Sequence, residues 1–434
     1  MGLWAAVALV VGNQLGTGVF TLPASLAPYG WNAVLGWVAT IAGALALAHV
    51  FGRLSVAVPG SGGPHAYTRA AFGEAPGFVV AWSYWVNIWV GNAAIAVATI
   101  GYIAVFLPGL ATDRRLATGA AIACVWAFTL INLRGVGAAG RVAVVTTLVK
   151  LVPLIAAALL AGWVFARHGM ASITPAAMPL SPHAVAASAT LTLWGVLGLE
   201  SANVPGGKVI DPGRTIPRAA LWGTGISGAV SLVVASAVML MGPPATIAAS
   251  SAPIADFAAR WAGGGWAMPI AAFATVSGLG CLSGWILLQG ELPAAMARAG
   301  VFPRALARTD ARGTPWMGHL VSSTLLSGVL MMNASGSLIG LFGFIIQVSG
   351  LAALLAYAMC ALAAIRLRAG GREFVGVALF AAAYSLWALT GADAKSLEWF
   401  AGLMLAGLPV YAFMRWRNAA TSPARADAAG APRG

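Results

Sequence analysis

The chain has 434 residues, of which 60% are hydrophobic and 8% charged, and its mean hydropathy is +0.87. This composition excludes an ordinary soluble domain and is typical of a polytopic membrane protein. The formal net charge is +13, but the basic residues are scattered singly between apolar runs, so we expect no nucleic-acid partner.

Twelve apolar runs, each near the length of about 20 residues that crosses the hydrocarbon of a bilayer, follow one another along the chain. They cover residues 3–26, 33–56, 76–107, 116–133, 142–165, 184–206, 219–241, 266–295, 317–332, 338–365, 374–390 and 397–414. No basic residue precedes the first run, so we expect a retained span and not a signal peptide. The sequence therefore predicts an all-α integral membrane protein with twelve transmembrane helices.

The basic residues also predict the orientation. With a cytoplasmic N-terminus, 18 Lys and Arg residues fall in cytoplasmic segments and five in outer loops. The positive-inside rule then places both termini in the cytoplasm. Residues 418–434 show no apolar periodicity and are predicted to form a disordered tail behind a single transmembrane domain over residues 1–417.

The first apolar run contains VGNQLGTGVFTLPA over residues 11–24. Gly16, Thr17 and Gly18 have low helix propensity and Pro23 follows, so we expect the helix to break there. Backbone donors freed at membrane depth need a partner, and the N-terminus of a half-helix favours an anion. This stretch is predicted to bind a carboxylate.

A second interruption lies five spans later, in WGVLGLES over residues 194–201. Interrupted segments in corresponding positions of two halves indicate an inverted-repeat transporter that holds its substrate at the midplane. The repeats would cover about residues 1–166 and 184–366, followed by two further helices over about 374–414. The alternative is that Gly195 and Gly198 are only packing points between helices.

Two aromatic residues and one acid stand near these interruptions. Trp194 and Trp285 offer π-faces to a distal cation, whereas interfacial or packing roles are the alternative for either one alone. Glu200 lies near mid-membrane, where a carboxylic acid is costly and functional by default; the alternative is a structural hydrogen bond. A substrate with an α-carboxylate and a distal cation fits this combination.

Four motifs in order resemble those of a known family. They are GTGVF from Gly16, PGSGGPHAYTRAAFG from Pro59 to Gly73, LWGVLGLES in the sixth run and DPGRTIPRA from Asp211. They are similar to signatures of the amino acid–polyamine–organocation transporters, nearest to the arginine/agmatine and basic amino acid/polyamine antiporter group.

The resemblance implies a LeuT-like 5+5 inverted repeat with broken helices 1 and 6 and two additional C-terminal helices. It also implies exchange of an arginine-like basic amino acid for its decarboxylated amine or a polyamine, in a homodimer of the bacterial inner membrane. No cofactor or metal is expected, and the three cysteines share no metal-like spacing.

The residues and the resemblance together indicate the substrate contacts and the gates. The substrate-binding candidates are Asn13, Gly16, Thr17, Gly18, Asn87, Ile88, Asn92, Trp194, Leu197, Trp285 and Ser349. The gating candidates are Tyr84, Trp194, Glu200, Phe342 and Tyr357. Asn87 and Ile88 stand where relatives have a small residue and a cysteine, so we expect a reshaped pocket.

Proton coupling is predicted for Glu200 and for Lys150, the basic residue inside the fifth run. In proton-coupled members of this superfamily a lysine at this place replaces a sodium ion; the alternative is that Lys150 extends to the membrane surface. A proton-coupled amino acid symporter or exporter is therefore the second hypothesis for function.

A membrane-embedded enzyme is the remote alternative. Such an enzyme needs paired acids, metal ligands or an acid with a histidine at one membrane face. The eleven acids and five histidines show no DxxxD or HxxE spacing, and no GxxxxGK loop occurs. We therefore expect no enzymatic activity.

Overall fold

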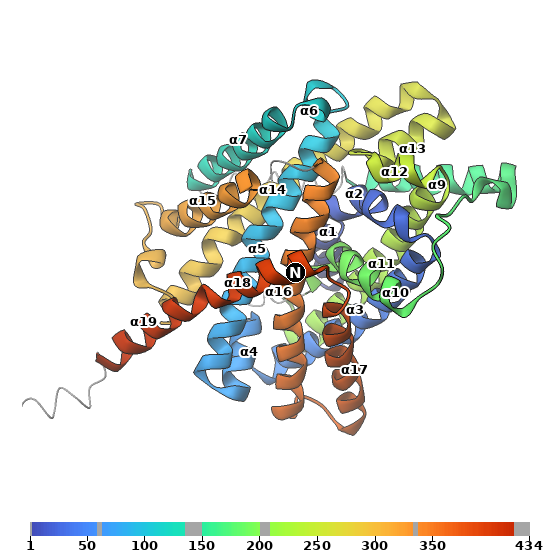
Figure 1. Ribbon diagram of the computed structural model, residues 1–434. Coiled ribbons are helices and arrows are strands. Elements are labelled where there is room, and N and C mark those ends of the chain that lie inside the picture. The colour runs from blue at the N-terminus through green and yellow to red at the C-terminus, as the bar shows by residue number, and fades with distance from the viewer. Residues whose placement is uncertain (1, 59–62, 135–149, 200–208, 333–336, 421–434) are drawn as a thin grey trace, which may run out of the picture.

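The computed structural model describes residues 2–58, 63–134, 150–199, 209–332 and 337–420 (Figure 1). Every regular element within these ranges is helical. The α-helices are α1 (Leu3–Gln14), α2 (Thr17–Leu26), α3 (Trp31–Ala57), α4 (Gly63–Phe72), α5 (Glu74–Ile103), α6 (Gly109–Thr112), α7 (Arg114–Leu133), α9 (Leu151–His168), α10 (Pro182–Thr192), α11 (Pro212–Leu240), α12 (Pro244–Ala249), α13 (Pro253–Ala262), α14 (Ala267–Arg298), α15 (Trp316–Met332), α16 (Leu338–Arg366), α17 (Arg372–Leu389), α18 (Ala394–Leu405) and α19 (Gly407–Ala420). Short 3-10 turns are η1 (Ala27–Tyr29), η2 (Gly169–Ser172), η3 (Leu193–Val196), η6 (Gly264–Trp266) and η7 (Arg304–Ala307).

The lengths of these helices confirm the prediction of an all-helical membrane protein. Nine helices in the described ranges are long and apolar enough to cross a bilayer, and the bent pair of α1 with α2 makes ten. Each predicted span has a helix over part of its residues. The helices α10 and α15 have only 11 and 17 residues, and the sixth predicted span continues into residues outside the described ranges. The count of twelve therefore stays a prediction.

Helix α5 forms the centre of the molecule, with α14 and α16 packed beside it (Figure 1). Of its most apolar stretch, 94% is buried, compared with 28% in α7 and 11% across α18 and α19. The outer helices expose large apolar side chains such as Leu159 and Trp416. In a bilayer the exposed side chains of the outer helices face lipid. Because α5 is buried almost throughout, any cavity inside the protein is expected to lie against α5.

Helix α3 fixes the end of α10 through small residues and buried hydroxyls. A Cβ at Gly43 would lie 2.2 Å from the ring of Tyr384 in α17, so only glycine permits this approach. The hydroxyl of Tyr384 donates to Thr40 over 3.2 Å, and Thr40 bonds Thr192, the last residue of α10, over 2.7 Å. The point where the sixth predicted span leaves its α-helix is thereby held in place.

At the C-terminal end, α19 runs to Ala420, three residues into the segment predicted as a tail. Residues 421–434 lie outside the described ranges.

Candidate functional site

The first predicted span breaks where its glycines indicate. Helix α1 ends at Gln14, α2 begins at Thr17, and their axes differ by 43°. The amide of Gly16 turns back to the carbonyl of Gln14 over 2.7 Å. The first amides of α2 point along the helix axis without acceptors inside the helix, as at any helix N-terminus. The break predicted at Gly16–Gly18 is confirmed in position.

The second interruption begins at the end of α10. The chain tightens into the 3-10 turn η3 and then extends at Leu197, with φ −63° and ψ 148°. Gly198 follows with φ +93°, a conformation that favours glycine. The α-helix is therefore lost between Leu193 and Gly198, and this stretch includes Trp194, the predicted aromatic contact of the substrate.

Gln14 connects the two interruptions. Its Nε2 donates to the carbonyl of Val196 over 3.1 Å and to Oγ1 of Thr224 in α11 over 3.0 Å. The first bond satisfies a backbone carbonyl freed by the loss of helix after α10. One side chain at the end of α1 thus holds the segment interrupted after α10.

The indole of Trp194 lies between two glycines. A Cβ at Gly18 would come within 2.7 Å of Trp194 Cδ1, and a Cβ at Gly91 in α5 within 2.9 Å of Cη2. Real Cβ atoms do not approach that closely, so both positions need glycine to admit the ring. Trp194 therefore packs α2 and α5 together from the second interruption.

A small cavity lies at this junction. It is lined by Asn13, Gln14, Gly16, Thr17, Gly18, Asn87, Ile88, Gly91, Ile95, Trp194, Leu197, Cys281 and Trp285. Its volume of about 30 Å³ is enough for about two water molecules. A substrate as large as an amino acid enters only if a wall of the cavity moves, and the two indoles are its bulkiest wall residues.

Nine of the eleven predicted substrate-binding residues line this cavity. The other two do not line it but bond residues near it. Ser349 Oγ donates to Asn87 Oδ1 over 2.8 Å, and Asn92 of α5 bonds Gln289 of α14. The cavity also has four wall residues that the sequence did not single out, which are Gln14, Gly91, Ile95 and Cys281. Helical spacing was the missed signal, because Gly91 and Ile95 follow Ile88 by three and seven positions, and Cys281 precedes Trp285 by four.

Of the predicted gating residues that the structure describes, Trp194 lines the cavity, whereas Tyr84, Phe342 and Tyr357 do not. Phe342 and Tyr357 are fully buried in α16, where Tyr357 packs edge-on against Phe51 with ring centroids 5.4 Å apart. Tyr84 lies on α5, seven positions before Gly91 and so near the same face. Glu200 lies outside the described residues, and its predicted roles stay predictions.

Lys150 lies directly before α9 and is 4% exposed. Its Nζ donates to the carbonyl oxygen of Gly12. That carbonyl belongs to the last turn of α1 and has no amide partner within the helix. The ammonium therefore lies beside the first break, and its predicted role in proton coupling stays a prediction.

A buried polar chain runs from the cavity floor toward α15. Asn92 Nδ2 donates to the carbonyl of Trp285 over 3.1 Å and to Gln289 Oε1 over 2.7 Å. Gln289 Nε2 donates to Ser323 Oγ over 2.8 Å, and Ser323 pairs with Thr129 over 2.7 Å. Asn92 Oδ1 is buried without a protein partner. The amide of Asn92 thus fixes the backbone that carries Trp285.

Comparison with known sequences decides the class of protein. The sequence model of the amino acid permease family matches residues 1–415. The chain belongs to this family. A cadaverine/lysine antiporter of Escherichia coli K12 is 35% identical over 361 residues, which are 82% of this permease and 80% of the antiporter. The putrescine transporter PotE of the same strain is 28% identical over 422 residues, 94% of this chain and 95% of PotE.

These relatives place the permease among multi-pass membrane transporters that belong to the superfamily its motifs resemble. The alternative of a membrane-embedded enzyme is thereby dropped. The names of these relatives state that one exchanges cadaverine and lysine and that the other transports putrescine.

Gln289→Met tests the polar chain behind the cavity. The variant keeps the volume of the side chain but removes one hydrogen bond from Asn92 Nδ2 and one from Ser323 Oγ, which keep their bonds to the Trp285 carbonyl and to Thr129. Each lost bond costs about 0.5–1.5 kcal/mol of stability. We expect a lower thermal unfolding midpoint in detergent. Gln347→Met is the control, because Gln347 is half-buried and accepts one bond from the exposed Asp393 amide. Equal losses in the two variants would contradict this reading.

Proposed function

We propose that this permease exchanges a basic amino acid for its decarboxylated amine or a polyamine by alternating access. The observation that carries the proposal is the cavity where the first turn of α2 and the indoles of Trp194 and Trp285 meet. One wall offers backbone donors and the other offers π-faces. The relatives' names, cadaverine/lysine antiporter and putrescine transporter, support the same class of exchange.

In this proposal the α-carboxylate binds the amides at the start of α2. The helix dipole favours an anion there, and Thr17 Oγ1 is buried without a protein partner, so its hydroxyl is available to the substrate. A decarboxylated amine lacks this group and leaves those donors unmatched. The amine therefore binds less tightly, which favours its release in exchange for the amino acid.

The distal cation of the substrate then lies against the aromatic wall. Cation–π contact contributes about 1–2 kcal/mol per ring when water is excluded. Asn87 and Ile88 line the same cavity, and their difference from the relatives' residues argues against strict arginine selectivity. We propose a basic amino acid with either an ammonium or a guanidinium group as the substrate.

The membrane arrangement belongs to the proposal as well. We propose twelve spans, a 5+5 LeuT-like inverted repeat over about residues 1–166 and 184–366, both termini in the cytoplasm, and a homodimer in the bacterial inner membrane. The break between α1 and α2 and the interruption after α10 lie five predicted spans apart. This spacing supports the repeat.

A proton-coupled transporter is the second candidate, and one observation favours it. Lys150 Nζ bonds the carbonyl of Gly12 beside the first break, so loss of its proton would replace a charge-assisted hydrogen bond to α1 by a weaker neutral one. The protonation state of Lys150 and the shape of the cavity are then coupled, and Glu200 remains the second proposed proton carrier. Exchange and proton coupling differ in whether a pH gradient drives accumulation.

Trp285→Leu and Trp194→Leu test the aromatic wall. Each variant should weaken substrate binding by about 1–2 kcal/mol, or about 5- to 30-fold, if a cation lies on the rings. The measurement is uptake of labelled lysine, arginine or cadaverine into liposomes preloaded with the unlabelled compounds. Trp222→Leu, at a tryptophan that is 58% exposed on α11, is the control and should match the parent. If both cavity variants keep the parent's half-saturating concentration for every transported compound, the cation of the substrate does not lie against these two rings.

Lys150→Ala tests proton coupling. If the lysine carries the proton, the variant should lose accumulation driven by an inward proton gradient and keep part of its substrate exchange. Uptake into proteoliposomes with and without the gradient gives both quantities. Full gradient-driven accumulation in the variant would exclude the role, and no gradient response in the parent would leave simple exchange.

A further inference from the structure

A second cavity lies at the arginine-rich end of the helices, away from the substrate cavity. Its volume is about 340 Å³. It lies between the α4–α5 corner, the turn after α14 and the helix α19. The lining residues are Arg69, Glu74, Gly77, Phe78, Ala299, Gly300, Val301, Tyr411, Met414, Arg415 and Asn418. Its volume is therefore about ten times that of the cavity beside Trp194, and it has room for a small organic ligand.

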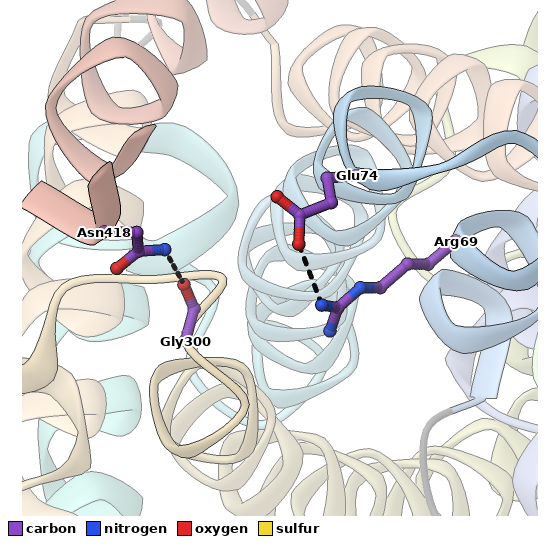
Figure 2. Close-up of polar contacts among 4 residues, drawn as sticks. All are labelled: Arg69, Glu74, Gly300 and Asn418. Atoms are coloured by element: carbon purple, nitrogen blue, oxygen red, sulfur yellow. Dashed lines mark hydrogen bonds and ion pairs between the residues drawn. The ribbon is translucent and has the colours of Figure 1, made fainter. Parts of the chain in front are cut away.

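The two arginines of this cavity differ in their partners. Arg69 Nη2 donates to Glu74 Oε1 over 2.9 Å, and both side chains are well exposed, at 47% and 76% (Figure 2). Arg415 has no ion pair or side-chain hydrogen bond within the part of the chain that the structure describes. One guanidinium is therefore unpaired, and the other has donors left after a single bond to its carboxylate.

The floor of the cavity is apolar and rigid. The ring of Phe78 packs against Tyr411 with centroids 5.0 Å apart and edge-on against Phe302 at 5.9 Å. Met414 is 2% exposed beneath them. Asn418 Nδ2 donates to the carbonyl of Gly300 over 3.3 Å and holds α19 against the turn after α14 (Figure 2). A basic rim above an apolar floor suits a ligand with an anionic head and an apolar body.

The cavity also lies where such a ligand is found. It opens at the start of α5, the end of α14 and the end of α19, and Arg298 and Arg417 belong to the same helix ends. These are ends of predicted spans, at the level of lipid headgroups. Basic pockets between membrane helices bind phospholipid headgroups, and the planar guanidinium matches phosphate oxygens.

We propose that this cavity binds the phosphate group of an anionic phospholipid, with Arg415 as its principal ligand and Arg69 as the second. Glu74 competes with the phosphate for Arg69 and lowers the affinity. The glycerol and upper acyl carbons lie against Phe78 and Met414. The proposal depends on the membrane location of the permease and not on which substrate it exchanges.

The test measures binding of short-chain phosphatidylglycerol to the purified full-length chain in a neutral detergent. Removal of a charged hydrogen-bond partner should weaken binding about tenfold in Arg415→Gln. Glu74→Gln should instead strengthen binding at least threefold, because it frees Arg69 and removes a like charge. Opposite signs from two neighbouring polar substitutions are not expected of a merely structural effect.

Two matched controls lie at the start of α17, where Arg372 and Glu373 are also exposed neighbours. Arg372→Gln and Glu373→Gln should leave the affinity unchanged, which excludes a general effect of net charge. Phosphatidylcholine of the same chain length and inorganic phosphate form the comparison arms. Weak binding of both supports the lipid as the source of the phosphate.

Four results would overturn the proposal. Three of them are equal affinity for phosphatidylcholine and phosphatidylglycerol, an unchanged affinity in Arg415→Gln, and equal losses in Arg415→Gln and Arg372→Gln. Inorganic phosphate binding as tightly as the lipid, and lost in Arg415→Gln, would assign the site to a soluble phosphate and overturn the lipid. Because substrate exchange is measured separately, failure here leaves the proposed function intact.

Discussion

The packing of one indole between two glycines is the contact on which the functional site depends. Trp194 comes from the second interruption, Gly18 from the first turn of α2, and Gly91 from the central helix α5. No larger residue fits at either glycine without moving the ring. The two interrupted segments and the most buried helix therefore cannot shift independently while the indole stays in place. In the proposed alternating access, a rotation of this ring would enlarge the cavity.

Backbone polarity explains why the interruptions lie in the protein interior. Peptide groups released from a helix in hydrocarbon must find partners, and here side chains supply several of them. Gln14 bonds the carbonyl of Val196, and Lys150 bonds that of Gly12. Thr17 Oγ1, in the first turn of α2, is buried without a protein partner. The protein thus satisfies these two carbonyls, and the proposed function assigns the donors of α2 to the carboxylate of the substrate.

The sequence predicted much of the fold because hydropathy and helix length are strongly constrained in a bilayer. The GTG stretch located the first break, since low helix propensity acts locally. Contacts between distant helices were less accessible. Gln14 and Val196 are 182 residues apart, and no local pattern fixes that pairing. The sequence shows no metal-like spacing for Cys281 but does not predict its place in the cavity, because that place follows from how α14 packs beside α2.

Asn92 shows how the neighbours of a side chain decide its bonds. The resemblance places Asn92 among the substrate contacts, which stays a prediction, and in this structure its Nδ2 bonds Gln289 and the backbone of Trp285. The buried Oδ1 remains without a protein partner. A side chain type predicts which bonds are possible, but its neighbours decide which bonds form. Gln289 lies in α14 and Asn92 in α5, so their bond could not be predicted from the residues around Asn92 alone.

Substrate protection of Cys281 tests the central claim most directly, because this thiol lines the cavity beside Gly16. In a chain with Cys124→Ala and Cys360→Ala, a small membrane-permeant thiol reagent would label Cys281 alone. The account predicts that lysine, arginine or cadaverine, whichever is transported, slows this labelling, with half-protection at the concentration that gives half-maximal exchange. A labelling rate that stays the same at saturating concentrations of a transported substrate would contradict it.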